Sequence, residues 1–380
     1  SSTAISVKLG QKDYRTAEEL LGNTVTLNLI VGFCFSAICL IFLDPILYFF
    51  GASKVTIPYA RSFMQIILCG NMISHMYFGM NAVLRAASKP RQAMNATIFT
   101  VVMNILLDVL FILVMHWGIR GAAFATVISQ TLALVYQMKL FTNKSELLHL
   151  KKGIYGLKAR LVKNIIAIGI SPFLMNLCAC LIIIFINNQL VKYGGDLMVG
   201  AYGIASAIST VFVMIIIGVN QGMQPIAGYN YGAQKIDRLL RVLKLAMITA
   251  TVIMTTGWLI AMTLPHLLAR IFTNDPSLIK IAVPAIRLNM LVFFIIGFQM
   301  VITNFFQCIG KVKISIFLSL SRQLLFLLPL LYVFPLQFGV KGVWYAMPTS
   351  DFIAAAVAGV IMVLYMRKFK QQIKQSIHEN

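Results

Sequence analysis

The sequence has few charged residues, and acidic residues are the scarcest of them. Only 11% of the 380 residues are charged, and Asp and Glu together account for 11 residues. Soluble globular domains carry about 25% charged residues, whereas 59% of this chain is hydrophobic. Because no soluble core can bury that much apolar surface, lipid must surround most of the chain. The composition therefore predicts an all-α integral membrane protein, with the lipid bilayer as its main partner.

The motifs of enzymes, metal sites and nucleic-acid binding are also missing. The chain has no phosphate-binding loop, and no nucleophile stands at a spacing that brings a base within reach. The six cysteines lie in apolar segments without zinc-type spacing. The net charge of +21 comes from Lys and Arg in short loops, not from one continuous basic face. We therefore expect no enzyme activity, no cofactor, no structural metal and no nucleic-acid partner.

Apolar runs long enough to cross a bilayer recur along nearly the whole chain. A transmembrane helix needs about 20 predominantly apolar residues, and short polar stretches separate the runs of this kind. The predicted spans are 19–43, 55–84, 93–115, 119–141, 162–191, 197–222, 236–264, 277–308, 313–335 and 340–366. We therefore expect about ten full transmembrane helices.

Basic residues divide unevenly between the two ends of these spans. Alternate loops place 24 of the 32 Lys and Arg residues on one side and 8 on the other. Positive charge is enriched in cytoplasmic loops, so the richer side, with the C-terminus, is expected in the cytoplasm. The basic segment 143–161 on that side predicts a linker between two lobes, and 369–380 a cytoplasmic tail.

The two halves of the chain resemble each other at a nearly constant interval. Residues 116–129 align with 337–350, and Lys89 recurs as Lys311. Duplication of a helical bundle over such a long period is typical of transporters. We therefore expect two pseudo-symmetric six-helix lobes, an N-lobe over 1–142 and a C-lobe over 162–368.

The repeat also predicts where the chain begins relative to a complete bundle. Spans 162–191 and 197–222 have no counterpart in the first half. The expectation is a twelve-helix fold of which this chain lacks the first helix and most of the second. The alternative is an asymmetric ten-helix protein.

Three motifs carry a resemblance to a known family. The most specific is NQGMQPIAGYNYGAQ at 220–234, and LRAASKPR at 84–91 and NILLDVLFI at 104–112 support it. With these motifs the chain resembles the multidrug and toxic compound extrusion (MATE) family over essentially its whole length. The resemblance implies a monomeric antiporter of a bacterial inner membrane, which exports cationic drug-like compounds against entry of Na⁺ or H⁺. The alternative is a lipid-linked oligosaccharide flippase of the same superfamily.

Asp108 is the main candidate for a coupling site. It lies inside an apolar run, and an Asp at a helix centre costs roughly 2.5–3.5 kcal/mol on insertion scales, so it should face protein or water. Asn104 is one turn earlier on the same helical face. Thr126, on the next helix, lies at nearly the same depth in the membrane as Asp108. The resemblance implies that these three residues take part in binding the coupling cation, together with an Asp on the first helix. The alternative is a carboxyl that only bonds a neighbouring helix, and the sequence does not choose between Na⁺ and H⁺.

Arg322 and Asp351 have nearly the same depth in consecutive spans. An unpaired Arg inside the membrane is costly, so we expect an ion pair, which either stabilises the fold or handles substrate or protons.

The span 55–84 contains a further set of candidates. Met72, Met76 and Met80 recur at helical spacing, and flexible thioethers suit a cavity for varied ligands. His75 in the same span can titrate near neutral pH. The alternatives are a plain core stripe for the methionines and a locally satisfied ring for the histidine.

Overall fold

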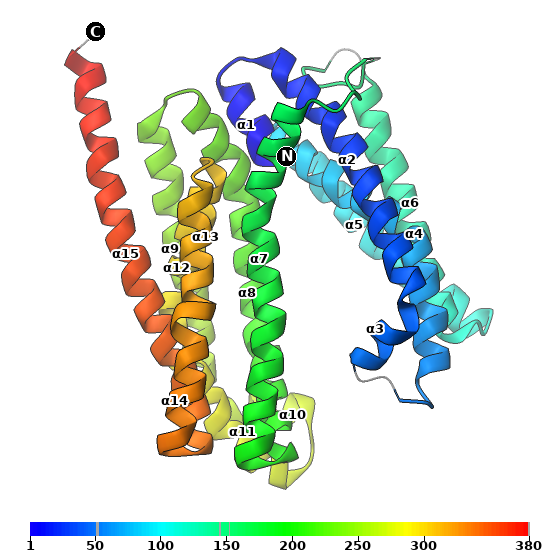
Figure 1. Ribbon diagram of the computed structural model, residues 1–380, viewed down its shortest axis with the longest axis vertical. Coiled ribbons are helices and arrows are strands. Elements are labelled where there is room, and N and C mark those ends of the chain that lie inside the picture. Colours follow the sequence, from blue (N-terminus) through cyan, green and yellow to red (C-terminus); the bar gives the residue numbers. More distant parts are fainter. Residues whose placement is uncertain (51–52, 144–145, 152, 379–380) are drawn as a thin grey trace. The chain divides into compact units, whose positions relative to one another are not determined.

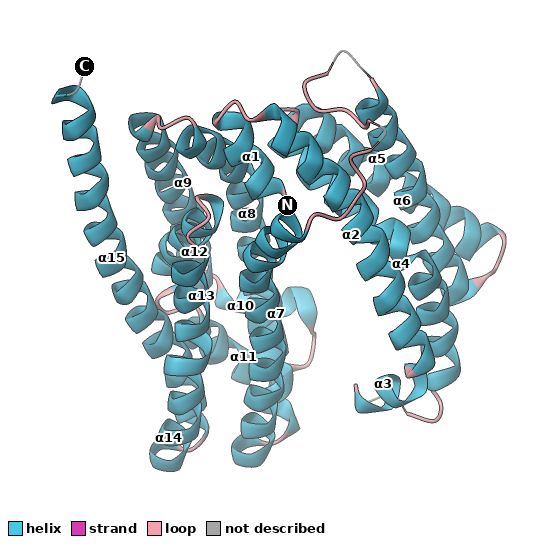
Figure 2. Ribbon diagram, turned by 45° about the horizontal axis from the view of Figure 1, so that its top comes forward, coloured by secondary structure: helices cyan, strands magenta, loops and turns pink. Residues whose placement is uncertain are grey.

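In the computed structural model, every described element is a helix, and loops join the helices (Figures 1 and 2). The structure describes residues 1–50, 53–143, 146–151 and 153–378. Residues 144, 145 and 152 of the predicted linker, and 379–380 of the predicted tail, lie outside the described residues. The prediction of an all-α protein is confirmed for the described part of the chain.

The chain divides into two compact units, Ser1–Ile165 and Ile166–Asn380. The first unit contains α1 (Ser2–Gly10), α2 (Tyr14–Ile41), α3 (Leu43–Phe49), α4 (Ile57–Ala86), α5 (Pro90–Asp108), the π-helix η1 (Val109–Val114) and α6 (Gly118–Thr142). The second unit begins within α7 (Ala159–Gly194). It continues with α8 (Asp196–Gly232), α9 (Ile236–Thr263), α10 (Pro265–Phe272), α11 (Pro276–Asn289), α12 (Phe293–Cys308), α13 (Val312–Leu320), the π-helix η2 (Ser321–Leu327), α14 (Leu328–Phe338) and α15 (Val340–His378).

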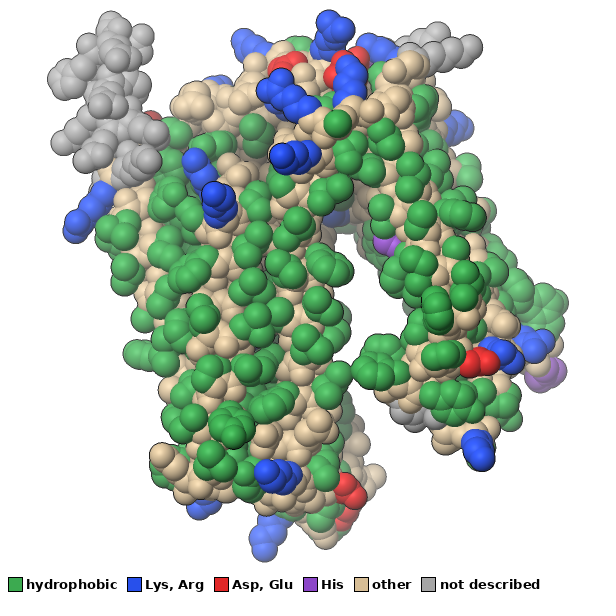
Figure 3. Space-filling view, viewed as in Figure 1, with side chains coloured by type: hydrophobic (Ala, Val, Ile, Leu, Met, Phe, Trp, Pro, Cys, Tyr) green, Lys and Arg blue, Asp and Glu red, His purple; other side chains and the backbone are tan. Residues whose placement is uncertain are grey.

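Eight helical segments of the described residues are long and apolar enough to cross a membrane. They are α2, α5 with η1, α6, α7, α8, α9, α13 to α14, and α15 as far as Arg367. A ninth results if α11 and α12, which meet at a bend of 50°, count as one broken span. On the face of each unit that Figure 3 shows, hydrophobic side chains cover the middle, and Lys and Arg gather near the ends. The chain is therefore a multi-pass membrane protein.

The span predicted at 55–84 is less apolar than the other nine predicted spans. Its helix, α4, has 30 residues, which is ample length for a bilayer. It is not among the helices that are apolar enough to be counted as spans, because it carries many polar side chains. Its polar residues bond to α2, α5 and α6 instead.

Helix boundaries recur at the interval of the sequence repeat. α2 and α9 each have 28 residues, and they begin 222 residues apart, at Tyr14 and Ile236. The turns before them contain Lys12 and Gln234, also 222 residues apart, with positive φ angles of 60° and 58°. The repeated sequence therefore builds the same turn and the same helix twice.

The turn before α2 is held by the side chain of Asp13. Its carboxylate caps the helix, accepting a hydrogen bond from the backbone N–H of Thr16 (3.2 Å). The Lys8 ammonium lies 3.1 Å from the other carboxylate oxygen. The hydrogen bonds from Thr16 and then from Lys8 lower the pKa of Asp13 below its usual value.

The segment that follows α6 packs on α2 of the first unit. Lys151 pairs with Glu18 at 2.6 Å. At Gly22 the two backbones come so close that an added Cβ would lie 2.2 Å from the carbonyl oxygen of Ile154. The predicted linker is thus attached to the first unit over its described residues, and Gly22 is required by this close approach.

Candidate ion-coupling site

Asp108 is the last residue of α5, at the point where the span changes from an α-helix to the π-helix η1. The wider turn is seen where the Met115 N–H donates to the carbonyl of Leu110, five residues earlier, at 2.9 Å. Single π turns are rare within helices and frequently occur at functional sites. Nothing in the sequence marks this change of helix type, because 109–114 is an unbroken apolar run.

The carboxyl of Asp108 has an unsatisfied oxygen. Its side chain is partly buried, and Oδ1 is inaccessible and lacks a hydrogen-bond partner among the described residues. A buried polar atom without a partner is unfavourable, and more so when it carries charge. A bound cation or a proton would remove this penalty. The environment of Oδ1 therefore fits a site that takes up a positive charge.

Asn104 and Thr126 are in contact between α5 and α6. The Asn104 side-chain amide donates to the Thr126 hydroxyl at 3.4 Å, and that hydroxyl donates to the backbone carbonyl of Ala122 at 3.0 Å. Asp108 lies one turn further along the face of α5 that carries Asn104. The structure thus places a carboxylate, an amide and a hydroxyl in one part of the first unit. Oxygen atoms of these types suit a hard cation.

The polar face of α5 is longer than the sequence analysis recognised. Thr97 and Thr100 precede Asn104 at the same helical spacing. The Thr100 hydroxyl donates to the hydroxyl of Tyr77 on α4 at 3.1 Å, and the Asn81 amide donates to Thr97 at 3.2 Å. The spacings of three and four residues between Thr97, Thr100 and Asn104 are the sequence pattern that predicts a shared helical face. These contacts align a row of polar groups along the interface between α4 and α5.

Arg322 and Asp351 lie together in the second unit. Arg322 is on η2 and Asp351 on α15, and Nε of the first is 3.1 Å from Oδ1 of the second. Asp351 is only 8% exposed. The Ser350 hydroxyl donates to the backbone carbonyl of Arg322 at 2.8 Å, a second link between the same elements. The geometry is that of the expected intramembrane ion pair.

The methionines of α4 occupy different positions from those expected of cavity-lining residues. Met76 and Met80 are 5% and 0% exposed, because they point into the core of the first unit and not toward an open cavity. Met72 is 37% exposed. The His75 ring lies edge-on to Phe35, with the two centroids 6.5 Å apart. Of this group, only Met72 and His75 remain accessible.

Comparison with known proteins gives consistent matches. The family model MatE matches residues 1–110 and 168–333. The chain is 25% identical over 360 residues to the multidrug export protein MepA of Staphylococcus haemolyticus (strain JCSC1435), a match that covers 95% of this chain and 79% of that protein. The range 1–110 contains Asn104 and Asp108.

Two solved structures show the same fold. One is the MATE multidrug transporter DinF-BH, solved as a complex, with 34% identity, a TM-score of 0.86 and coverage of 95% of this chain and 81% of that one. The other is an outward-facing multidrug resistance MATE family transporter of the MOP superfamily, with 23% identity and a TM-score of 0.91 over 97% of this chain and 83% of that one. The latter shows similarity of fold alone.

Proposed function

The chain belongs to the MatE family, and on that premise we propose that it is a secondary active multidrug exporter, an antiporter that expels small cationic amphipathic compounds in exchange for Na⁺ or H⁺. Relatives named multidrug export proteins, and the multidrug transporter DinF-BH, support drug-like substrates. They favour this function over an oligosaccharide flippase. The proposal includes no cofactor beyond the coupling ion.

The observation that carries the coupling proposal is the unpartnered carboxylate oxygen of Asp108. A charge at this depth is costly unless it is neutralised, and Oδ1 has no donor in the described structure. Asn104 and Thr126, already in contact at 3.4 Å, supply the neighbouring oxygen atoms. Uptake of Na⁺ or H⁺ at Asp108 would therefore change both the charge and the packing between α5 and α6.

This change provides a mechanism for exchange. In a state open to the outside, the ion reaches Asp108 and the hold on a cationic substrate weakens. The substrate leaves, and the lobes rock to face the cytoplasm, where the ion is released. One net charge that moves inward through 100 mV supplies about 2.3 kcal/mol, enough for a roughly 50-fold concentration difference of substrate. For a substrate with a single positive charge, this contribution requires that more than one Na⁺ or H⁺ enters for each substrate molecule exported, because one-for-one exchange moves no net charge.

We also propose the location and state of the protein. The uneven division of Lys and Arg supports a cytoplasmic C-terminus in a bacterial inner membrane. The proposed working unit is a monomer, because a single chain carries Asp108, Asn104 and Thr126 together. A reporter fused to the C-terminus should be active only if it is of a type that functions in the cytoplasm.

The function is tested by transport of a cationic dye in vesicles that contain the purified protein. A Na⁺ gradient and a pH gradient are imposed separately, each against a vesicle with no gradient. We expect one gradient, or both, to drive the dye against its concentration difference. Dye movement that is the same with and without the gradients would refute antiport. The absence of transport of every cationic compound tested would refute drug export.

A further inference from the structure

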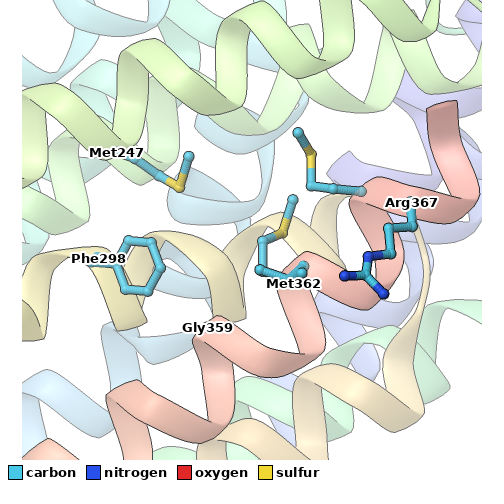
Figure 4. Close-up of a pocket in the computed structure, with 7 residues that line it drawn as sticks. Met247, Phe298, Gly359, Met362 and Arg367 are labelled. Carbon is cyan, nitrogen blue, oxygen red and sulfur yellow. The ribbon is translucent and has the colours of Figure 1, made fainter.

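A groove of about 480 Å³ lies in the second unit, between α9 and α15 (Figure 4). Both helices pack on α12, and the groove follows the space that this leaves between them. Its volume is within the range of about 300–1,000 Å³ that is typical of small-molecule sites. We call it the methionine groove, and its main lining residues are Met247, Phe298, Gly359, Met362, Met366 and Arg367.

The lining of the methionine groove is apolar except at one end. Figure 4 shows Met247 and Met362 pointing into the groove, with Phe298 toward one end and Arg367 at the other. Thioether side chains adapt to flexible apolar ligands. No carboxylate is among the described residues that line the groove, and Arg367 repels cations. A cationic export substrate is therefore a poor occupant, whereas a molecule with an apolar chain and an anionic end fits both features.

Positive charge is concentrated at the cytoplasmic end expected for the groove. Arg367 directly follows the predicted span 340–366 and is exposed. Lys244, also exposed, lies three residues before Met247 and therefore on the same face of α9. Neither residue has an ion pair with the described part of the chain. Two cations thus stand at the depth where lipid headgroups lie.

The helices that border the methionine groove present apolar side chains outward. On α9, Ile248 and Val252 are 51% and 59% exposed, and on α15, Val360 and Leu364 are 61% and 57% exposed. Side chains of this type at mid-membrane depth are suited to contact with lipid tails. The groove therefore adjoins surfaces that face the bilayer.

We propose that the methionine groove binds one anionic phospholipid of the cytoplasmic leaflet. An acyl chain lies along Met247, Phe298 and Met362, and the phosphate contacts Arg367 and Lys244. Basic pockets between transmembrane helices on the cytoplasmic side bind anionic headgroups in this way. The methionine groove does not include Asp108, so this proposal does not depend on the proposed coupling mechanism.

The headgroup contact is tested by native mass spectrometry of the purified full chain, mixed with equal amounts of phosphatidylglycerol and phosphatidylcholine. We expect one phosphatidylglycerol to bind in preference to phosphatidylcholine. Arg367→Gln and Lys244→Gln should each weaken this preference about fivefold. Arg367→Lys should retain it. Arg238→Gln is the matched control, because Arg238 lies nine residues from Met247, on the opposite face of α9.

The tail contact is tested by filling the groove. A Cβ at Gly359 would lie 3.7 Å from the Phe298 ring, an ordinary contact distance, so the helix accepts a side chain here, and Gly359→Leu places a larger apolar side chain in the groove. It should abolish the tightly bound lipid, while Val360→Leu, one residue away and outward-facing, should not. Equal binding of the two lipids by the unmodified chain, or an unchanged preference in Arg367→Gln, would overturn the proposal. One-for-one displacement of the lipid by a cationic dye would assign the groove to substrate instead.

Discussion

At the scale of single residues, the carboxyls of Asp108 and Asp351, both within membrane-spanning segments, have different environments. Asp351 has a cation 3.1 Å away, on Arg322. Asp108 has no such partner in the described structure, and one of its oxygens is orphaned. The fold itself neutralises the charge of Asp351, whereas the charge of Asp108 is neutralised only when a cation or a proton binds. This contrast favours a structural role for Asp351 and a coupling role for Asp108.

Loss of one partner from the buried ion pair should destabilise the protein more than loss of both. Asp351→Ala leaves Arg322 with an uncompensated charge and should lower the free energy of unfolding by about 3 kcal/mol. The double variant Arg322→Met with Asp351→Leu removes both charges and should cost much less. Thermal unfolding of the purified variants in detergent measures the difference. Equal losses in the single and double variants would contradict the structural role.

The cap of α2 should depend on pH through Asp13. Because its pKa is lowered in the folded state, the stabilisation from its carboxylate is present above the ordinary Asp pKa of about 3.9 and is lost as pH falls through the lower folded value. Asp13→Asn should therefore melt at a lower temperature than the unmodified chain at neutral pH. The gap should close as the pH is lowered through that window. A gap that does not change with pH would exclude the carboxylate as its cause.

At the scale of elements, the close approach between α2 and the segment after α6 makes Gly22 a sensitive position. Gly22→Ala places a Cβ against the backbone of Ile154, and overpacking of this kind costs about 1–3 kcal/mol. Gly203→Ala is the matched control, since Gly203 is also within a helix but has nothing within 4 Å of its Cβ position. There, alanine should raise stability by about 0.5–1 kcal/mol. Thermal unfolding that shows both substitutions stabilising would refute the close contact.

The positions of the helices followed from hydrophobic run length, but their internal irregularities did not. The span predicted at 277–308 is bent by 50° between α11 and α12, and residues 290–292 at the bend contain neither Gly nor Pro to mark it. The π segments η1 and η2 are likewise unmarked by Gly or Pro. Lipid-facing and core-facing apolar residues look alike in a sequence, so these features depend on tertiary packing.

In the candidate site, too, some features were predictable from the sequence and others depend on tertiary packing. Depth along antiparallel helices predicted that Thr126 is level with Asp108 and Arg322 with Asp351, because helical rise is constant. The observed contacts join Thr126 to Asn104, one turn from Asp108, and Arg322 to Asp351. Depth was not enough for the methionines of α4, where three residues on one face differ in exposure from 0% to 37%. Which part of a helical face is covered depends on the neighbouring helices. That information is not contained in spacing alone.

At the scale of the whole molecule, the repeat and the charge division are the two organising features. Helices α2 and α9 begin at equivalent places in the repeat, yet the charged residues of the membrane interior differ between the units. Asp108 lies in the first unit, and Arg322 and Asp351 lie in the second. The repeat thus supplies a common architecture, and the two units carry different polar chemistry on it.

The most direct test of the account measures two activities of the Asp108→Asn variant in vesicles. One is accumulation of a cationic dye driven by the gradient that drives the unmodified protein. The other is exchange of dye at equal concentrations with no gradient, which reports that the variant is folded and still binds substrate. Asp44→Asn is the matched control, because Asp44 also has one carboxylate oxygen without a partner in the described structure but is paired through the other with Arg61 at 2.6 Å. The account predicts that Asp108→Asn loses gradient-driven accumulation and keeps exchange, while Asp44→Asn keeps both. Undiminished gradient-driven accumulation in Asp108→Asn would contradict it.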